Sequence, residues 1–445
     1  MKSFYLIVLF LGCTTICHAQ QRLTKEQLHE DANVLYSSIL DVHPYMFTNI
    51  SKEKFEKELE QIKSTLKDSM TAFDFYKMFA PLVAKIEDGH TELDYPVNLA
   101  IKHGVKVFPY TFAINKTDTT LIIQKGFEGA KLSPGFSILT INGVSSKELL
   151  RQAFTMLSGE TYHFKMEKLN ILFSPLLHFI LPSNEFLVEY LNNGKIETTT
   201  IQAKTFSQYM EVLLVPSIRK TPYYFNIDKK LGTAILSINS FDIYDKQGKK
   251  EYRNFLDSLF NEISQNHINN LVIDIRMNGG GLEELVWDLF QYISPVPFQT
   301  KGPSINKISE TVKAVYNMKE QPGIYLLGAE GLIPLRENSL RYSGNTYLLT
   351  SNFTFSSASL LAWAFQYFKM GEIIGEETGG LIVSYGNVFN TNLPNTDLSY
   401  GISKWKLYGS EASEDHKHGV IPDIIIPSEK AKDAVIEIIK NKNKR

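Results

Sequence analysis

The sequence has 445 residues, 43% hydrophobic and 12% aromatic, enough to build the cores of two or three globular domains. Lys and Arg (46) nearly balance Asp and Glu (48), and the net charge of −2 offers neither a basic field for nucleic acid nor a polybasic membrane patch. We therefore expect peptide or small-molecule partners. The sequence lacks Cys/His metal spacing, and we predict neither a metal nor a cofactor.

The first 19 residues have the pattern of a secretory signal peptide. A cationic tip at Lys2 precedes a short apolar run over 4–11, and small residues stand near Ala19, where signal peptidase would cut. Cleavage after Ala19 would remove both cysteines of the chain. We predict a secreted or periplasmic protein with no integral membrane span. A lipoprotein modified at Cys13 is the second interpretation.

Residues 20–98 are predicted to form a helical cap. Thr24 and Gln27 have the spacing of a capping box, and apolar residues recur at helical spacing along the segment. Gly89 marks the end of the last helix, and His90 follows it. A histidine at such a place is more often a companion of the helix end than a catalytic group.

Residues 99–205 change to short β-type runs and form a separate module. A glycine, a short apolar strand and an Asn142-Gly143 turn are followed by a helical pattern from Lys147 to Leu157. This order resembles a PDZ-like domain, in which a strand edge and a helix form a groove for an added peptide strand. Asn142-Gly143 is equally typical of an ordinary β-hairpin.

Residues 206–445 return to alternating strands and helices, which predicts a mostly parallel sheet. The predicted strands and helices are 233–238, 252–263, 270–276 and 283–292. Three glycines at 279–281 let the backbone present bare N–H groups, as an oxyanion site requires. Residues 294–345 show few clean periodicities, and we expect a long excursion that covers the site as a lid.

A strand-to-helix turn is predicted at Thr354-Phe-Ser-Ser-Ala-Ser359. The apolar run Tyr347 to Leu349 precedes it, and an apolar helix pattern follows up to Gly371. A serine at such a turn commonly caps the helix. The other interpretation is a nucleophile, because the first N–H groups and the dipole of the helix favour a nearby oxyanion. Taken alone, these residues favour the cap.

Several short motifs follow one another in a fixed order, and the ordered set identifies a protein family far more specifically than any single motif. They are Asp88-Gly-His-Thr91, Gly135 to Gly143, Asp274-Ile-Arg-Met-Asn-Gly-Gly-Gly281, Thr354 to Ser359, Gly375-Glu-Glu-Thr-Gly-Gly380 and Gly419-Val-Ile-Pro-Asp423. This set resembles the tail-specific (C-terminal processing) serine peptidases, a family that includes the tricorn protease core and, without peptidase function, the repeats of interphotoreceptor retinoid-binding protein.

The resemblance covers His90 to Ile426. It implies an α/β fold with a crotonase/ClpP-like peptidase core over 206–445, an N-terminal helical cap over 20–98 and an inserted PDZ-like domain over 99–205.

The resemblance also implies site residues. Aligning Gly375 and Glu376 without gaps puts the nucleophile of the family on Ser356. Ser357 is the runner-up. Placing the nucleophile there would need a one-residue deletion in the helix, which would rotate the following residues by about a third of a turn. The backbone N–H groups of Ser357 and Gly280 then resemble the oxyanion hole of the family.

The base is inferred in the same way. The position of the family's catalytic lysine is Leu381 here, so a Ser–Lys dyad is not supported. The tricorn type uses a histidine from the cap, which implies His90, and a carboxylate that orients it. Glu414 lies in the matching stretch, with Asp415 as the alternative. Gly89 stands where the tricorn type has an assisting serine.

We predict an exported serine endopeptidase that acts through an acyl-enzyme on a peptide or protein substrate. Its PDZ-like domain would recognise substrate C-termini. The alternative is a catalytically inactive binding protein of the same fold that holds a peptide or an apolar ligand. A crotonase-like acyl-CoA enzyme shares only the core and does not explain a signal peptide. Whether the chain forms a homo-oligomer stays open.

Overall fold

The computed structural model describes residues 21–115, 118–211, 222–329 and 331–444. The predicted signal peptide and Cys13 lie outside these residues. Among the helices of the described ranges, none is both long enough and apolar enough to cross a membrane.

The N-terminal region is helical, as predicted. It consists of α1 (Lys25–Val42), α2 (Lys52–Ser64), α3 (Ala72–Val83) and a short 3-10 turn, η1 (Ala84–Ile86). Thr24 Oγ1 accepts the backbone N–H of Gln27 at 3.3 Å, and the Gln27 side chain accepts the N–H of Thr24 at 2.9 Å. The predicted capping box is confirmed.

The following region is a small α/β unit. Its elements are α4 (Val97–Lys102), β2 (Lys106–Val107), β3 (Tyr110–Ile114), β4 (Leu121–Gly126), β5 (Ser137–Ile141), β6 (Val144–Ser145), α5 (Ser146–Thr155), α6 (Tyr162–Ile180), β7 (Glu185–Asn192), β8 (Lys195–Gln202), β9 (Lys204–Thr205) and α7 (Phe206–Tyr209). In the described chain its main sheet has the order β3-β4-β5-β7-β8. Helix α6 was not predicted, because it is buried on several sides and lacks a one-faced apolar pattern.

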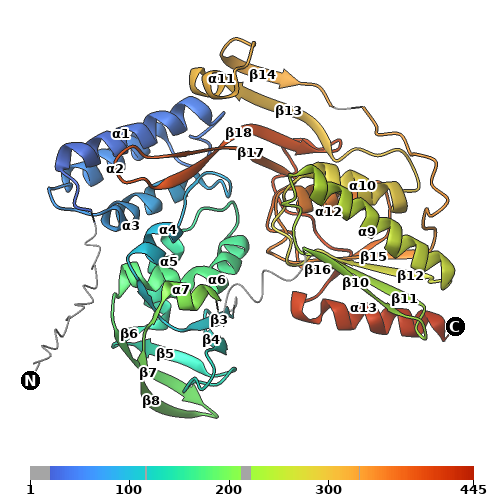
Figure 1. Cartoon of the computed structure of the whole chain (residues 1–445), viewed down its shortest axis with the longest axis horizontal. Helices are drawn as coiled ribbons and strands as arrows, with labels where there is room; N and C mark the ends of the chain where they lie inside the picture. Colours follow the sequence, from blue (N-terminus) through green and yellow to red (C-terminus); the bar gives the residue numbers. More distant parts are fainter. Residues whose placement is uncertain (1–20, 116–117, 212–221, 330, 445) are drawn as a thin grey trace, which may run out of the picture.

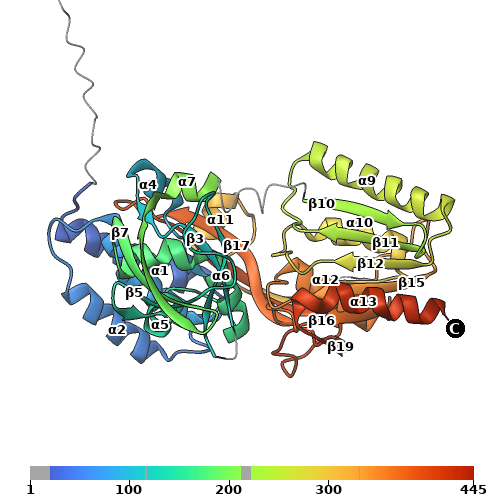
Figure 2. The same ribbon diagram turned by 90° about the horizontal axis from the view of Figure 1, so that it is seen from below.

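The α/β core contains the predicted parallel sheet (Figure 1). Strands β11 (Thr233–Ile238), β12 (Asn270–Asp274), β15 (Asn345–Thr350), β16 (Glu372–Gly375) and β19 (Ile424–Ile425) pair in this order in parallel, and β10 (Tyr223–Asp228) pairs antiparallel with β11. Helices α9 (Lys246–Gln265), α10 (Glu283–Ile293) and α12 (Ser357–Tyr367) cover one face of the sheet, and α13 (Ser428–Asn443) covers the other (Figure 2).

Alternating strand residues explain these two layers. Ile273 and Leu348 pack with the helices of the first face, whereas Val272 and Leu349 pack against α13. Successive side chains of a strand point to opposite sides, so a strand that is apolar throughout is buried on both faces.

A second sheet joins the core to the N-terminal helices. Its long strands β17 (Val383–Asn392) and β18 (Ser399–Gly409) leave the core and extend toward α1 and α3 (Figure 1). Strand β18 also pairs with β1 (Glu92–Leu93) and β13 (Lys301–Ile308), and β13 pairs with β14 (Gly323–Leu327). Because Glu92 is in register with Gly401, the chain just after His90 is fixed to β18.

The stretch 294–345 was expected to be an irregular lid. It instead contains β13, α11 (Glu310–Tyr316) and β14, and β13 is an inner strand of the second sheet. The long-range pairing with β18 gives this stretch its regularity, which local periodicity does not reveal. The domain boundaries proposed from sequence stay predictions.

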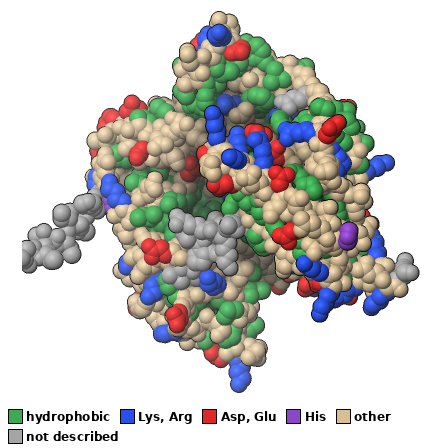
Figure 3. All heavy atoms as spheres, turned by 45° about the vertical axis from the view of Figure 1, so that its right-hand side comes forward, with side chains coloured by type: hydrophobic (Ala, Val, Ile, Leu, Met, Phe, Trp, Pro, Cys, Tyr) green, Lys and Arg blue, Asp and Glu red, His purple; other side chains and the backbone are tan. Residues whose placement is uncertain are grey.

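Charged side chains of both signs lie interspersed over the face of the molecule drawn in Figure 3. This distribution agrees with the nearly balanced composition.

Candidate active site

Ser356 lies at the sharp turn between β15 and α12. Its backbone has φ 54° and ψ −128°, a conformation that a residue with a Cβ rarely adopts. Ser356 occupies the N-cap position of α12, yet its side chain makes no capping hydrogen bond. The interpretation of Ser356 as a helix cap, which the local sequence alone favours, is therefore wrong.

Hydrogen bonds to the neighbouring strand end hold this turn. The hydroxyl of Thr354 donates to the carbonyl of Ile275 at 3.1 Å. The backbone N–H of Phe355 donates to the carbonyl of Asn278 at 3.1 Å. Because the two residues that precede Ser356 are tied to the end of the neighbouring strand, the surrounding structure imposes the strained backbone of Ser356.

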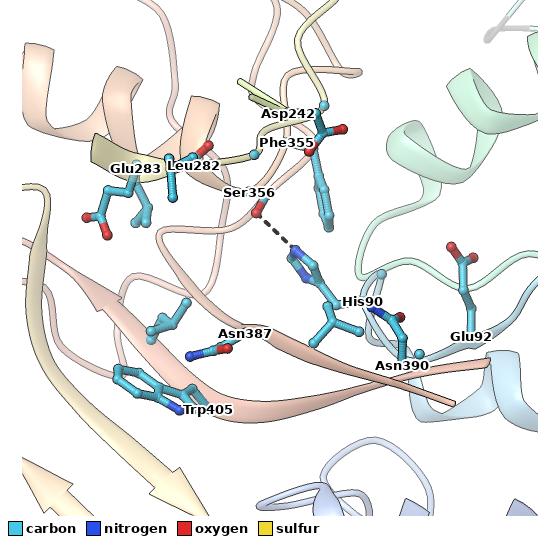
Figure 4. A pocket seen from close by; sticks show the side chains of 18 of the residues that line it. His90, Glu92, Asp242, Leu282, Glu283, Phe355, Ser356, Asn387, Asn390 and Trp405 are labelled. Carbon is cyan, nitrogen blue, oxygen red and sulfur yellow. Dashed lines mark hydrogen bonds between the residues drawn. The ribbon is translucent and has the colours of Figure 1, made fainter. Parts of the chain in front are cut away.

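His90 approaches Ser356 from the N-terminal region. Its Nε2 lies 3.0 Å from Ser356 Oγ, although 266 positions separate the two residues (Figure 4). The imidazole packs against the ring of Phe355, with ring centroids 4.6 Å apart, and Phe355 stacks on Phe164 with centroids 4.2 Å apart. A hydroxyl and an imidazole held in hydrogen-bond reach are what general-base activation of a nucleophile requires.

Ser356 and His90 line a cavity of about 730 Å³. The core, the loop that carries His90, and strands β17 and β18 all contribute to its walls (Figure 4). This volume is in the range of sites that bind small ligands or peptide segments. Polar and charged residues of the wall include Glu92, Asp94, Asp242, Glu283, Lys301, Asn387 and Asn390.

Asp88 is a fully buried carboxylate beside His90. Its Oδ1 accepts the backbone N–H of His90 at 2.9 Å. Its Oδ2 accepts hydrogen bonds from His43 (3.2 Å), Thr91 (2.5 Å) and Ser403 (2.6 Å). Burial alone would raise the pKa of Asp88, but the hydrogen bond and charge of His43 outweigh it, and the pKa lies well below its usual range. Asp88 is thus a fixed negative charge that anchors the His90 loop.

The imidazole of His90 is itself mostly buried. Burial lowers the pKa of His90, and the charges of Asp88 and Glu92 only partly oppose this effect. Within the described ranges, His90 Nδ1 is buried without a hydrogen-bond partner. Asp88 Oδ1 is 3.8 Å from it, beyond hydrogen-bond distance.

Glu160, in the link between α5 and α6, is a second carboxylate near His90. Both of its carboxylate oxygens are buried and lack hydrogen-bond partners in the described structure. Burial, followed by the charge of Asp88, raises the pKa of Glu160 to about 8. Backbone N–H groups of Gly89 and Glu160 itself oppose this rise, but neither forms a hydrogen bond that meets normal geometry.

Asp88, His90 and Glu160 offer ligand-type atoms within 4.8 Å of one another, the spacing of a metal site. The oxygens of Asp88 are already occupied by hydrogen bonds from the protein. We therefore interpret Asp88 and Glu160 as carboxylates that control the protonation of His90, not as metal ligands.

The predicted oxyanion donors differ from each other. Ser357 is the first residue of α12, and no hydrogen bond of the described chain uses its backbone N–H. The N–H of Gly280 instead donates to Asn278 Oδ1 at 2.8 Å. A Cβ on Gly280 would lie 2.6 Å from the Cβ of Ser356, so glycine is required here. Gly280 must release or share its N–H before it can stabilise an oxyanion.

The structure does not bring Glu414 to His90. Glu414 accepts hydrogen bonds from Lys406 and Tyr408 and forms an ion pair with Lys417 at 2.9 Å. Burial would raise the pKa of Glu414, but these partners lower it to about 2. Its side chain is 48% exposed. The alternative, Asp415, is also exposed. The partners of Glu414 thus lie on β18 and in the loop that follows β18, and none of these hydrogen bonds or ion pairs joins it to His90.

The position of the family's lysine is likewise not part of this site. Leu381 forms a β-bridge with Gly419 and carries no basic group.

Sequence reasoning named the Asp88 motif but gave Asp88 no role, and it missed Glu160. Asp88 could have been noticed as the acidic neighbour of His90. Glu160 stands alone between Gly159 and Thr161, and no periodicity or motif marks it as buried.

Residues 232–426 match the family model of peptidase family S41. The chain carries an S41 peptidase domain. The family predicted from the ordered motifs is confirmed, and with it the class of serine peptidases.

The crystal structure of mature CPAF covers 93% of this chain and 97% of its own, with a TM-score of 0.64 and 14% identity. This likeness shows a shared fold, and the mixed α/β fold with a ClpP/crotonase-like core is confirmed. The photosystem II D1 C-terminal processing protease aligns over 94% of this chain and 98% of its own with a TM-score of 0.46 and 15% identity. The PDZ-like assignment stays a prediction.

A curated relative is the replicase polyprotein 1a of Lettuce infectious yellows virus (isolate United States/92). It is 24% identical over 224 residues, which are 45% of this chain and 11% of the polyprotein. The chain thus spans about a tenth of the length of this relative.

Proposed function

We propose that this protein is an exported serine endopeptidase that cleaves peptide bonds through an acyl-enzyme on Ser356. The observation that carries the proposal is the 3.0 Å approach of His90 Nε2 to Ser356 Oγ. The strained turn at Ser356 and the adjoining cavity support it. The S41 domain supplies the class of reaction.

In the first half of the reaction, His90 Nε2 takes the proton of the Ser356 hydroxyl while Oγ attacks the carbonyl carbon of the scissile bond. The negative charge on the carbonyl oxygen develops beside the N-terminus of α12, where the N–H of Ser357 can donate to it. The buried charge of Asp88 stabilises the imidazolium that forms.

In the second half, the imidazolium gives its proton to the leaving amine, the C–N bond breaks and Ser356 stays acylated. Water then attacks the ester, with His90 again accepting a proton. Hydrolysis releases the acid and restores the Ser356 hydroxyl, so the cycle uses no group outside the protein and water.

A fluorophosphonate probe tests this proposal. Wild-type protein should become labelled, and mass spectrometry should place the label on Ser356. Ser356→Ala should remove labelling and peptide hydrolysis together, while Ser413→Ala, in the exposed loop after β18, should retain both. Folded wild-type protein that is neither labelled nor hydrolytic would favour the inactive binding protein, and a label on Ser357 would move the nucleophile to the runner-up.

Export is proposed from the pattern of residues 1–19. Mature protein recovered from the producing cells should begin at Gln20. An N-terminus at a diacylated Cys13 would replace this proposal with a lipid anchor.

Recognition of substrate C-termini by the 99–205 region is also a proposal. The edge of β3 is covered by α6, since Asn170 Oδ1 accepts the N–H of Ile114 (2.9 Å) and Ser174 donates to the carbonyl of Tyr110 (2.6 Å). Among the described strands, β8 pairs with β7 alone, so its outer edge is the place where a peptide strand could be added. Peptides with a free C-terminal carboxylate should be cleaved faster than their amidated forms. Equal rates would remove tail recognition but not the peptidase.

A further inference from the structure

On the His90 side of the candidate catalytic pair, three buried atoms lack hydrogen-bond partners among the described residues. They are Nδ1 of His90 and both carboxylate oxygens of Glu160. The two side chains, together with Asp88, place ligand-type atoms within 4.8 Å of one another. Nearly all buried polar atoms in proteins are hydrogen-bonded, so complementary groups left unpaired this close to each other call for an explanation.

The carboxylate of Asp88 is not free to serve Nδ1. Its Oδ1 holds the backbone N–H of His90, and its Oδ2 accepts three side-chain hydrogen bonds. It stands 3.8 Å from Nδ1 and acts there through its charge. Glu160 has the opposite properties, since neither of its oxygens is bonded elsewhere in the described chain.

The surroundings of Glu160 direct it to this place. Thr161, the next residue, caps α6 by accepting the N–H of Phe164 at 3.1 Å, which fixes the backbone beside Glu160. On the other side, a Cβ at Gly89 would lie 2.8 Å from Glu160 Oε2 and 2.7 Å from the ring of Phe355. The space that Gly89 leaves open is therefore filled by the Glu160 carboxylate, one residue from His90.

We propose that Glu160 is the positioning carboxylate of His90, which accepts the Nδ1–H either directly after a small side-chain rotation or through one bridging water. This inference rests on the proposed function of Ser356 and His90. A hydrogen bond at Nδ1 decides which ring nitrogen carries the proton. Glu160 would thereby keep Nε2 free to accept the proton of Ser356.

The protonation of Glu160 then sets the tautomer of His90. An ionised Glu160 accepts from Nδ1–H and leaves Nε2 as the acceptor. A protonated Glu160 donates to Nδ1, which puts the imidazole proton on Nε2, and Nε2 then donates to Ser356 Oγ and cannot act as a base. The Glu160–His90 couple becomes active when it loses the one proton that its two side chains share.

The direction of the pH dependence follows from the charges around the pair. Burial lowers the pKa of His90, so the shared proton resides on Glu160, whose pKa is raised to about 8 by burial and by Asp88. Glu92 on β1 and Lys168 on α6 also face the pair, and their charges act in opposite directions. Acylation should therefore rise with pH toward about 8, above the ordinary range of imidazole.

The experiment measures the rate of fluorophosphonate labelling and the kcat and KM of peptide hydrolysis from pH 5 to 10. Every sample contains EDTA, so that a metal held by the three side chains cannot contribute. Glu160→Gln keeps the shape of the side chain but cannot ionise. Glu160→Asp keeps the carboxylate on a shorter chain. Glu148→Gln, the same change at a partly exposed position of α5, is the matched control.

Glu160→Gln should move the acidic limb by at least one pH unit toward acid, because His90 then titrates alone at its lowered pKa. Its limiting kcat should fall at least about tenfold with KM little changed, because the imidazole loses its charged acceptor. Glu160→Asp should keep the acidic limb near that of the wild type, and Glu148→Gln should match the wild type.

A Glu160→Gln protein with the rate and limb of the wild type would overturn the role of Glu160. If that variant does not fold, the wild type still decides, since a wild-type limb below the ordinary imidazole range contradicts the shared proton. Failure of the proposed function looks different, because wild-type Ser356 would then not be labelled at any pH.

Discussion

The two sides of the candidate catalytic pair are built differently. On the nucleophile side, the turn at Ser356 is tied to the core through Thr354 and Phe355, and the atom left unpaired there is the neutral hydroxyl of Ser357. On the base side, His90 and Glu160 are titratable, and three of their buried atoms lack partners in the described structure. Hydrogen bonds hold both sides, but only the base side contains buried titratable atoms without partners in the described structure, so only it can change with protonation.

This difference indicates a division of labour. A backbone conformation as strained as that of Ser356 persists only where surrounding contacts impose it, so geometry is set on the core side. The raised pKa of Glu160, beside the fixed charge of Asp88, places pH sensitivity on the base side. Substitutions on the two sides should therefore leave different signatures.

The largest effect is expected from His90→Ala. It should lower kcat by roughly 10³-fold or more, because no other imidazole forms a hydrogen bond to Ser356 Oγ in the described chain. The residual rate should lose its acidic limb. His163→Ala, exposed on α6, is the control and should leave kcat unchanged. A folded His90→Ala protein with near-normal hydrolysis would show that the base is another residue.

Asp88→Asn should have the second largest effect. Removing the charge that stabilises the imidazolium should lower kcat by about 100-fold. Loss of the buried ionic hydrogen bonds to His43, Thr91 and Ser403 should lower the free energy of unfolding by about 3 kcal/mol.

The stability effect of Asp88→Asn should depend on pH. The pKa of Asp88 is lowered on folding, so its contribution is present above the unfolded value of about 4 and is lost as the pH falls through the lower folded pKa. Urea unfolding of both proteins from pH 3 to 7 measures this. A difference in stability that stays constant down to pH 3 would contradict an ionised Asp88.

Thr354→Val tests the nucleophile side. Valine keeps the shape but loses the hydrogen bond to the carbonyl of Ile275 and the one accepted from the N–H of Ser351 (3.0 Å). The free energy of unfolding should fall by about 1–3 kcal/mol. We expect kcat to fall about tenfold through misplacement of Ser356, with the pH profile unchanged. A shifted acidic limb in this variant would show that the two sides are not separable as described.

Much of the nucleophile side could be predicted from sequence, because its information is local. An apolar strand, a turn rich in hydroxyl groups and an apolar helix follow one another within one short stretch, and β15 and α12 lie where this pattern placed them. The parallel sheet could be predicted for the same reason. The approach of His90 to Ser356 was anticipated only through the family resemblance, since nothing local joins positions so far apart.

Glu160, on the base side, could not be predicted, because it meets His90 only through long-range packing. Glu160 reaches His90 because α6, which the sequence did not reveal, stacks Phe164 on Phe355 and brings the α5–α6 link beside Gly89. Burial and the neighbouring charge of Asp88 raise the pKa of Glu160, and neither is visible in the residues on either side of it.

The smallest effect is expected from Glu414→Gln, and it sharpens the comparison because Glu414 was the carboxylate predicted from the motif offset. Its ionic partners are Lys406 and Lys417 at a partly exposed position, where ion pairs contribute up to about 1 kcal/mol. The substitution should therefore change the free energy of unfolding by less than this and kcat by less than about twofold. The pH profile should also stay in place, since the pKa of about 2 keeps Glu414 ionised throughout the assay range.

A comparison of Glu414→Gln with Glu160→Gln under the same conditions shows which of the two carboxylates affects the protonation of His90. A strong loss of kcat in Glu414→Gln together with a normal Glu160→Gln would return the orienting role to Glu414 and require the loop after β18 to move toward His90 during the reaction.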